Sequence, residues 1–361
     1  MEKNILRKKD KMYRVVLTGG GTAGHIWPLV AVEEALKNNK RVNIKYIGSF
    51  SGMEKEIARK NNLAFTGILV GKKRAYFSFM NFIDLFKIIF GLIQTYFILL
   101  FYQPNAVMAK GGYVSFPVIF WAKHFKIPLV IHESDILMGK SNKYAAKYAQ
   151  KICIGFPLQY FKDIPLNKVV YTGTPVRKEF YTSNAEQSNL PTILITGGSQ
   201  GAQIINETIE QILPQLTEKY QVIFYVGEKN LDHYKDKQLK NLKIIGFSEN
   251  IADDMKKADL IISRAGANTL AEISALKKAS ILIPYAAASN DHQAVNAKVY
   301  ADAQAAIVIS EKYLTSESLL AIINQLMSDS KLLKILGDHA HQFAREDSVG
   351  EIVDIIFEVI K

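Results

Sequence analysis

The feature that most constrains the fold is a local pattern that occurs twice: a short apolar run, a glycine-rich loop and a segment with helical spacing. The first copy spans residues 13–36 with its loop at 19–24, and the second spans 192–216 with its loop at 197–202. Glycine tolerates positive φ and lets the backbone approach a ligand closely, and the following helix directs unpaired N–H groups and its positive dipole end at the loop. Each loop therefore predicts a phosphate or diphosphate site, although a tight turn without a ligand would produce the same pattern.

Two well-known nucleotide-binding motifs do not fit the first loop. Its glycines have the spacing of the dinucleotide fingerprint, but that fingerprint also requires an acidic residue at the end of the second strand, where this chain has Gly48 and Ser49. A P-loop requires a lysine after its last glycine, and His25 stands there instead. The sequence therefore disfavours an oxidoreductase, and we expect no cofactor. His25 places a titratable group beside the predicted anion site.

Short apolar runs alternate with helical patterns along most of the chain, which is typical of βαβ units and a parallel sheet. We predict an α/β protein with two Rossmann-like lobes that face each other across a cleft, with ligands at the carboxyl ends of the strands. The N-terminal lobe should cover 1–175 and the C-terminal lobe 190–345, because prolines and a polar run mark a linker at 176–189. A helix at about 346–361 should pack back on the N-terminal lobe. The expected strands are 13–18, 42–48, 105–109, 128–132, 151–154, 192–196, 221–226, 242–246, 259–263, 280–284 and 305–309.

Composition narrows the class of partner. The net charge of +11 over 361 residues favours acidic partners such as phosphorylated substrates or anionic lipid. The basic residues are scattered and form no recognisable nucleic-acid motif, so we expect no nucleic acid. The single cysteine, Cys153, excludes a disulfide framework within the chain and fits a reducing cytoplasm. No His/Cys pair has structural-metal spacing and no Asp-x-Asp triplet occurs, so we expect no metal.

The segment 76–102 breaks the alternating pattern, because it is dense in Phe, Ile, Leu and Tyr. Asp84 and Lys87 interrupt it, and the longest uncharged run is shorter than the roughly 20 residues that a membrane span needs. Three basic residues at 72–74 precede it. Cations beside a strongly apolar helix suit a protein that lies on an anionic bilayer surface. A helix buried in the core is the alternative, and the sequence leaves both open.

Two loops after strands in the second half carry candidate sugar-binding residues. In 263–272, Glu272 could accept hydrogen bonds from both hydroxyls of a ribose. The alternative is a capping box, since Thr269 and Glu272 have its spacing. In 284–297, amide side chains gather at a helix start and suit sugar hydroxyls, although an ordinary helix cap would look the same.

A third glycine turn, at 110–117, follows a strand of the first half. It should face the same cleft as His25, because both follow strands of one parallel sheet at their carboxyl ends. A structural turn with no ligand is the alternative.

Seven motifs in order resemble those of the peptidoglycan N-acetylglucosaminyltransferases of glycosyltransferase family 28. The resemblance implies the two-lobed GT-B fold and an inverting transfer of N-acetylglucosamine from UDP-N-acetylglucosamine. It also implies that the acceptor is the undecaprenyl-diphosphate-linked muramyl peptide (lipid I), that the product is lipid II, and that the enzyme lies peripherally on the cytoplasmic side of the cell membrane. Other cell-wall synthesis proteins would be further partners. The motifs lie at 20–28, 110–117, 132–134, 173–177, 197–202, 263–269 and 291–297.

The same resemblance implies roles for individual residues. Ser199 would contact the donor diphosphate, Glu272 the ribose, and Gln293 the hydroxyls of the transferred sugar. Arg177 would face the donor from the segment between the lobes. His25 would be the general base on the acceptor hydroxyl, a task that suits an imidazole near neutral pH, or would only orient the acceptor or stabilise charge. Lining the cleft near the donor sugar and the acceptor diphosphate would be Thr22, Ala23 and Gly24.

Two positions depart from the family pattern. Ala23 stands where glycine is frequent, and its methyl group requires a negative φ. Asp135 stands where asparagine is frequent, and because a carboxylate cannot donate as an amide does, we assign it no role in the site. Two rival functions remain: a UDP-N-acetylglucosamine 2-epimerase of the same fold, and a binding-only subunit of a split transferase, which the presence of both halves in one chain disfavours.

Overall fold

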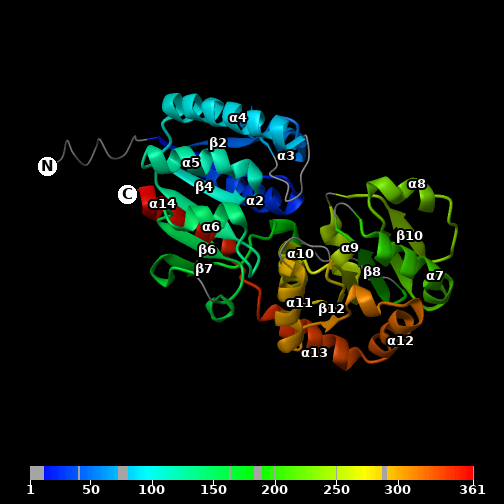
Figure 1. The fold of residues 1–361 in the computed structure, drawn as a ribbon. Helices are drawn as coiled ribbons and strands as arrows, with labels where there is room; N and C mark the ends of the chain where they lie inside the picture. The colour runs from blue at the N-terminus through cyan, green and yellow to red at the C-terminus, as the bar shows by residue number, and fades with distance from the viewer. Residues whose placement is uncertain are drawn as a thin grey trace. The chain divides into compact units, whose positions relative to one another are not determined.

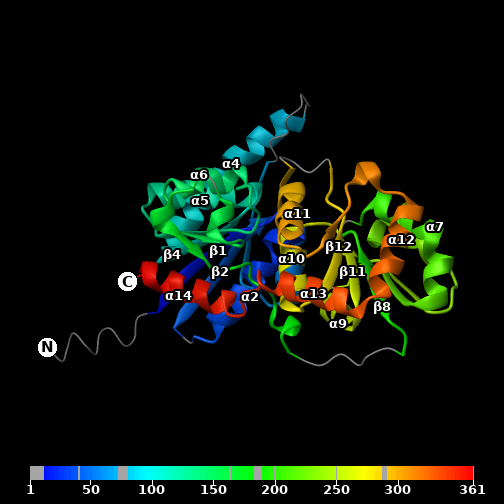
Figure 2. The ribbon, with the colours of Figure 1, turned by 90° about the horizontal axis from the view of Figure 1, so that it is seen from below.

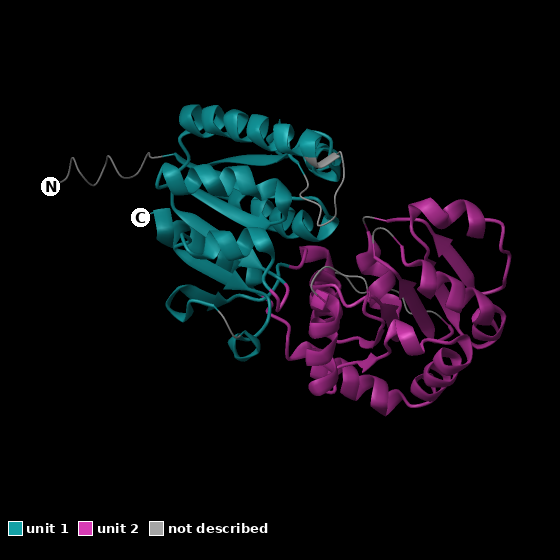
Figure 3. Cartoon of the chain, viewed as in Figure 1, with its two compact units in different colours: residues 1–134, 138–175, 347–361 teal, residues 135–137, 176–346 magenta. Residues whose placement is uncertain are grey.

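A computed structural model describes the chain in eight ranges, and Figures 1 and 2 show it from two directions. The described ranges are 12–39, 41–71, 80–161, 164–182, 189–198, 201–248, 250–286 and 291–360. The chain divides into two compact units (Figure 3). Unit 1 consists of Met1–Ser134, Met138–Pro175 and Asp347–Lys361, and unit 2 consists of Asp135–Leu137 and Val176–Glu346.

Unit 1 is built on a seven-stranded sheet with the order β3-β2-β1-β4-β5-β6-β7, in which all neighbours are parallel. Its strands are β1 (Tyr13–Gly19), β2 (Val42–Ser49), β3 (Phe65–Ile68), β4 (Ala106–Gly111), β5 (Leu129–Glu133), β6 (Lys151–Ile154) and β7 (Val169–Tyr171). This confirms the predicted parallel α/β class. The sequence pattern did not predict the two edge strands, β3 and β7.

Helices cover both faces of this sheet. They are α2 (Trp27–Lys37), α3 (Met53–Lys60), α4 (Met80–Tyr102), α5 (Phe116–His124), α6 (Lys140–Ala146) and α14 (Ser348–Ile360). Successive side chains of a strand point to opposite faces, so Val15 and Leu17 join the core beneath α2, α3 and α14, whereas Val16 joins the core beneath α4, α5 and α6. Buried strands of this kind are apolar on both faces, which is why they read as continuous apolar runs in the sequence.

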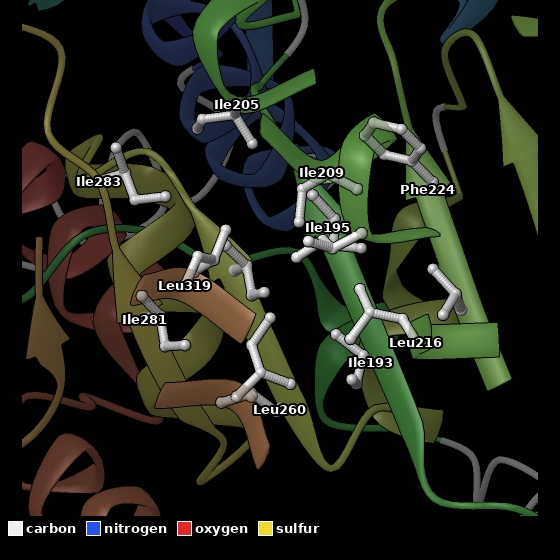
Figure 4. Close-up of a cluster of buried hydrophobic side chains, with 14 of the residues drawn as sticks. Ile193, Ile195, Ile205, Ile209, Leu216, Phe224, Leu260, Ile281, Ile283 and Leu319 are labelled. Carbon is white, nitrogen blue, oxygen red and sulfur yellow. The ribbon is translucent and has the colours of Figure 1, made fainter. Parts of the chain in front are cut away.

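Unit 2 repeats the arrangement with a six-stranded parallel sheet of order β10-β9-β8-β11-β12-β13. Its strands are β8 (Thr192–Thr196), β9 (Gln221–Tyr225), β10 (Leu242–Ile245), β11 (Leu260–Ser263), β12 (Ala279–Leu282) and β13 (Ile307–Val308). Its helices are α7 (Gln203–Lys219), α8 (Leu231–Tyr234), α9 (Ile251–Lys257), α10 (Ala267–Ala275), α11 (His292–Asp302), α12 (Ser316–Met327) and α13 (Ser330–His341). Figure 4 shows Ile193 and Ile195 of β8 in a buried cluster that also includes Ile209 and Leu216 of α7.

Each glycine-rich loop lies at the point where the strand order of its sheet reverses. In unit 1 the chain leaves β1 toward β2 on one side and later returns to β4 on the other, and in unit 2 β8 stands between β9 and β11 in the same way. Ligands of open α/β sheets bind at the carboxyl ends of the strands at such switch points. The topology therefore places both loops where a ligand is expected.

The long helix α4 is only partly covered by the rest of unit 1. Thr95 and Leu99 are buried, and the indole N–H of Trp121 on α5 donates to the carbonyl oxygen of Leu92 at 2.8 Å. The other side of α4 exposes ten large apolar side chains, so the alternative of a helix buried in the core does not hold. These are Phe82, Ile83, Leu85, Phe86, Ile89, Phe90, Ile93, Phe97, Leu100 and Phe101.

Among the described residues, one helix, Phe82–Tyr102, is long and apolar enough to cross a membrane by length and composition. The basic residues at 72–74, which the sequence analysis coupled to this helix, lie outside the described ranges.

Candidate functional site

The loop after β1 is shaped by glycine. Gly21 has φ of 88°, and a Cβ atom there would lie 2.6 Å from the ring of Tyr113. A Cβ atom on Gly20 would overlap with the carboxylate of Glu54. The amide N–H of Gly21 donates to Oε1 of Glu54 at 2.7 Å, and Glu54 is fully buried. This N–H group, which a phosphate could have bound, is therefore held by a carboxylate of the protein.

The predicted residues Thr22 to His25 form one short turn at the carboxyl end of β1. Ala23–His25 is a 3-10 helix, and Thr22 precedes it in an extended conformation. The hydroxyl of Thr22 lies 2.9 Å from Nδ1 of His25. Ala23 is not among the residues with positive φ, so its methyl group is tolerated, as the sequence analysis required. Gly24 lies between Ala23 and His25 in the same turn.

The glycine turn after β4 lies directly against the first loop. This confirms that the turn and His25 lie at the same edge of the sheet, where the strands have their carboxyl ends. Gly112 has φ of 80°, and a Cβ atom there would overlap with the carbonyl oxygen of Gly20 and lie 3.5 Å from Nδ1 of His25. The hydroxyls of Ser115 and Ser141 both donate to the carbonyl oxygen of Gly112, at 2.9 and 2.8 Å. Two side chains thus fix this turn beside the histidine.

A buried polar network continues from β4 and β5. The ammonium group of Lys110 donates to the hydroxyl of Ser134 at 2.6 Å, and the hydroxyl of Thr174 donates to the same oxygen at 3.3 Å. His132 lies with Nε2 2.8 Å from the carbonyl oxygen of Gly173. Burial lowers the pKa of His132 well below its usual value, and the charge of Lys110 lowers it further. His132 is therefore neutral, and its Nε2–H is the donor. The sequence analysis assigned none of these residues a role, because each is ordinary outside this contact.

The loop after β8 in unit 2 has the same glycine geometry. Gly198 and Gly201 have φ of 80° and 74°. The Gly201 N–H donates to the Gly198 carbonyl oxygen at 2.9 Å. A Cβ atom on Gly198 would have no atom within 4 Å, whereas one on Gly201 would press against the carbonyl oxygen of Val226. Ser199, the predicted contact of the donor diphosphate, lies outside the described residues.

Glu272 lies on α10, and the structure corrects one interpretation of it. The helix begins at Ala267 with Gly266 as N-cap, and no side chain caps it. Thr269 is therefore inside the helix, and the alternative of a capping box does not hold, because the helix begins three residues earlier than it would with Thr269 as N-cap. The pKa of Glu272 is raised to about 7, mainly by burial. The positive charge of Arg177 partly offsets this rise, and the negative charge of Glu179 adds to it.

Arg177 belongs to unit 2 and acts on Glu272 through its charge. It precedes the 3-10 helix Lys178–Phe180 and packs its guanidinium group 5.5 Å from the ring centre of Phe180. Its Nη1 lies 3.4 Å from Oε1 of Glu179. Arg177 and Glu272, two of the predicted donor-site residues, thus belong to the same unit and interact electrostatically.

Gln293 is the second residue of α11 and holds the loop after β12. Its Oε1 accepts from the backbone N–H of Tyr285 at 3.0 Å. Arg264 holds the same loop from β11: its Nη1 donates to the carbonyl oxygen of Ile283 at 3.0 Å and pairs with Oε1 of Glu311 at 2.6 Å. Arg264 is not among the site residues predicted from the sequence. The signal in the sequence is an arginine directly after a mostly apolar strand, where burial requires partners for the charge.

Asp135, which the sequence analysis left out of the site, holds the side chain of Asn296. Asn296 is fully buried, and its Nδ2 donates to Oδ1 of Asp135 at 2.8 Å while its Oδ1 accepts from the N–H of Ile136 at 3.2 Å. The carboxylate is needed here as an acceptor, so its inability to donate does not matter.

No group of three or more His, Cys, Asp or Glu side chains within the described ranges could hold a metal ion.

Comparison with protein families gives two adjacent matches. Residues 15–154 match the glycosyltransferase family 28 N-terminal domain, and residues 192–349 match the glycosyltransferase family 28 C-terminal domain. Together these two regions contain both glycine-rich loops and every predicted site residue except Arg177.

Curated relatives align over almost their whole length. Proteins of Lachnoclostridium phytofermentans and Clostridium perfringens, both named UDP-N-acetylglucosamine–N-acetylmuramyl-(pentapeptide) pyrophosphoryl-undecaprenol N-acetylglucosamine transferase, are 38% and 39% identical to this chain. The alignments cover 96% and 97% of this chain and 99% and 98% of the two relatives.

Solved structures share the architecture. The crystal structure of Acinetobacter baumannii MurG has a TM-score of 0.76 and 28% identity, covering 96% of this chain and 99% of that one. A putative UDP-N-acetylglucosamine 2-epimerase from Listeria monocytogenes has a TM-score of 0.67 over 96% of this chain and 97% of that one. Its identity is 12%, which shows a common fold and nothing further.

Proposed function

The chain belongs to glycosyltransferase family 28, and within it to the MurG type, and on this premise we propose that it transfers N-acetylglucosamine from UDP-N-acetylglucosamine to a lipid-linked muramyl pentapeptide. The product is lipid II, a precursor of peptidoglycan. The observation that carries this proposal is the near-complete alignment with curated transferases at 38–39% identity. The epimerase alternative has only the common fold in its favour.

On the donor side, the proposal assigns the nucleotide to unit 2. Glu272 would accept hydrogen bonds from the two ribose hydroxyls, since a carboxylate offers acceptors in the required number. Gln293 would bind hydroxyls of the transferred sugar with the amide group that also holds the backbone of Tyr285. The charge of the diphosphate would be met by Ser199, by backbone N–H groups at the start of α7 and by Arg177.

On the acceptor side, the proposal makes His25 the general base. The acceptor hydroxyl attacks the anomeric carbon of the donor sugar, its proton passes to the imidazole, and UDP leaves with the bonding electrons of the broken C–O bond. In the tautomer that this role requires, Nδ1–H of His25 donates to the hydroxyl of Thr22, 2.9 Å away, and Nε2 is the base. Displacement from the face opposite to the leaving group inverts the configuration at the anomeric carbon.

We also propose that the exposed side of α4 lies on the cytoplasmic surface of the cell membrane. Soluble monomers rarely expose a contiguous apolar patch as large as the one formed by the ten side chains of α4. Because α4 is tied to α5 by the bond from Trp121 and buries Thr95 and Leu99, it fits a helix that lies in the interface rather than one that crosses it. The net charge of +11 would add attraction to anionic lipid.

The test is a transfer assay with purified protein, radiolabelled UDP-N-acetylglucosamine and a short-chain analogue of lipid I. Label should move to the lipid only when the analogue is present. Conversion of the donor to its 2-epimer without acceptor would favour the epimerase. Firm UDP binding without turnover in either assay would favour a binding subunit.

A further inference from the structure

Glu54 is a fully buried carboxylate directly beneath the loop that carries the predicted base. It lies in the first turn of α3, and its Oε1 accepts from the N–H of Gly21 at 2.7 Å. A Cβ atom on Gly20 would overlap with its Oε1, and one on Gly52 would overlap with its Oε2. Because Gly20 and Gly52 have no side chain, the carboxylate of Glu54 fits between them.

The carboxylate accepts from a loop N–H group that an anionic ligand could otherwise bind. Backbone N–H groups at such a loop form a concave site for an anion. Here the N–H of Gly21 points at Glu54, so the protein supplies the anion itself. The role of this loop then changes from binding a phosphate to presenting the residues that follow it.

Three other contacts hold the same loop in place. The hydroxyl of Tyr46 donates to the carbonyl oxygen of Gly19 at 2.7 Å. The ring of Tyr113 covers Gly21, and Gly112 lies against the carbonyl oxygen of Gly20. Of these contacts, only the one from Glu54 satisfies a backbone donor of the loop, and it comes from a residue 33 positions away in the sequence.

We propose that Glu54 is a positioning residue for the transfer reaction, which holds the loop 20–22 so that Thr22 and His25 meet the acceptor in the reactive geometry. This inference rests on the proposed function, because it needs His25 to act on the acceptor. It assigns Glu54 no contact with either substrate. A displacement of about 1 Å at a reacting group can lower a rate about 100-fold, so loss of a loop contact is sufficient to reduce turnover.

The position of each carboxylate oxygen predicts which substitution is tolerated. Oε1 makes the bond to Gly21, whereas Oε2 is buried without a hydrogen-bond partner among the described residues. Glu54→Gln keeps the accepting oxygen and replaces only the oxygen that binds nothing. Glu54→Ala removes the acceptor and leaves the N–H of Gly21 buried and unsatisfied. Burial also raises the pKa of Glu54, whereas backbone hydrogen bonds, including the one from Gly21, lower it.

The experiment compares Glu54→Ala and Glu54→Gln with wild type in the lipid I transfer assay, and measures amide hydrogen exchange of the peptide that contains Gly21. The matched control is Glu56→Ala, which removes an exposed glutamate from the same turn of α3. We expect Glu54→Ala to lower kcat roughly 10- to 100-fold and to speed exchange of that peptide. The KM for UDP-N-acetylglucosamine should stay within about twofold, because the residues proposed to bind its nucleotide are in unit 2. Glu54→Gln and Glu56→Ala should resemble wild type.

The proposal is wrong if Glu54→Ala keeps its kcat, if its main effect is on the KM of the donor, or if Glu54→Gln is as inactive as Glu54→Ala in a folded protein. Should Glu54→Ala not fold, Gly52→Ala serves instead. The φ of −87° at Gly52 admits alanine, and the added methyl group displaces the carboxylate, so the same loss of kcat is expected. A wild type without transfer activity would reject the proposed function, whereas unchanged exchange of the Gly21 peptide in Glu54→Ala would reject the inference alone.

Discussion

The burial of His132 should make the stability of the protein depend on pH. Its pKa in the folded state is well below its usual value because of burial and the charge of Lys110. In the unfolded chain it takes up a proton below about pH 6.5, and in the folded chain it does not. Since the unfolded state binds the additional proton, stability falls as the pH drops through that value.

We therefore expect the melting temperature of the wild type to fall between pH 7.5 and pH 5.5, and this fall to be smaller in His132→Gln. Glutamine places an amide donor where Nε2 donates to the carbonyl oxygen of Gly173, so the bond is kept while the titration is removed. His124→Gln, at an exposed position on α5, is the control and should keep the wild-type slope. Equal slopes in wild type and His132→Gln would contradict the assignment.

Glu272 should make donor binding depend on pH, because burial raises its pKa whereas burial lowers that of His132. Its pKa of about 7 means that the carboxylate forms only as the pH rises through neutrality. If it accepts from both ribose hydroxyls, the affinity for UDP-N-acetylglucosamine should rise roughly tenfold between pH 6 and pH 8. This factor corresponds to the free energy that a hydrogen bond to a charged group contributes. Calorimetric titration would measure this. Glu272→Gln should bind more weakly with a flat profile, and a flat profile in the wild type would exclude this role.

His25 can be tested by separating binding from turnover. His25→Ala should keep its affinity for UDP-N-acetylglucosamine and lose about 100- to 10,000-fold in kcat, the usual contribution of a general base. The affinity should be measured calorimetrically on the same preparation as the rate. Loss of donor binding would show that His25 serves the donor and not the acceptor.

At this scale, the sequence predicts residues whose role is local and misses those whose partner is distant. The turn from Thr22 to His25 could be predicted because its glycines and helix start are contiguous. Glu54 could not, because nothing near it in the sequence indicates that its partner is the N–H of Gly21. Asp135 was set aside for lacking a donor, but its partner, the amide of Asn296, requires an acceptor.

Helix α4 is the element whose surface makes the clearest prediction. Phe86 and Phe90 lie one turn apart on its exposed side and are 61% and 55% exposed. Burying a large apolar side chain contributes about 1.5–3 kcal/mol, so replacing both with serine should weaken binding to anionic vesicles at least tenfold, measured by co-sedimentation. Leu166→Ser changes a 65% exposed apolar residue of unit 1 outside α4 and should leave binding unchanged. Undiminished binding of the double variant would place the membrane contact elsewhere.

In unit 1 the central strands were predictable and the edge strands were not, for one physical reason. The five central strands of unit 1 are buried along most of their length and carry clusters of apolar residues that stand out in the sequence. The edge strands β3 and β7 have four and three residues and are mostly half-buried, so they lack such a run. In unit 2 the edge strand β10 was predicted over 242–246 and is observed at Leu242–Ile245. Strand β13 was predicted over 305–309 but pairs only at Ile307–Val308, again at an edge.

At the scale of the whole molecule, the fold class follows from the alternation of strands and helices, and the repeated glycine loop indicates two similar halves. The sequence pattern did not indicate that Asp135–Leu137 belongs to unit 2. The N–H of Ile136 in this segment donates to Oδ1 of Asn296, which is 160 positions away in the sequence. Long-range pairs of this kind leave no periodic signal in one sequence.

The proposed function assigns the nucleotide and the acceptor to different units of the chain, and hydrogen exchange can test this assignment directly. The proposed donor residues Arg177, Ser199, Glu272 and Gln293 belong to unit 2, whereas Thr22 to His25 belong to unit 1. Because a ligand that binds the native state slows the local opening of the segments it contacts, UDP alone should protect segments of unit 2 and leave those of unit 1 unchanged.

We expect saturating UDP to slow exchange in 197–206, 264–272 and 285–296, while the peptide that covers 20–26 exchanges as in the free protein. UDP lacks the transferred sugar, so nothing in the proposal brings it to the loop after β1. Glu272→Ala is the control, since it should reduce protection at all three segments together if they form one nucleotide site. Protection of 20–26 by UDP alone would mean that the loop presented by Glu54 serves the nucleotide, and the division of substrates between the units would then have to be reversed or abandoned.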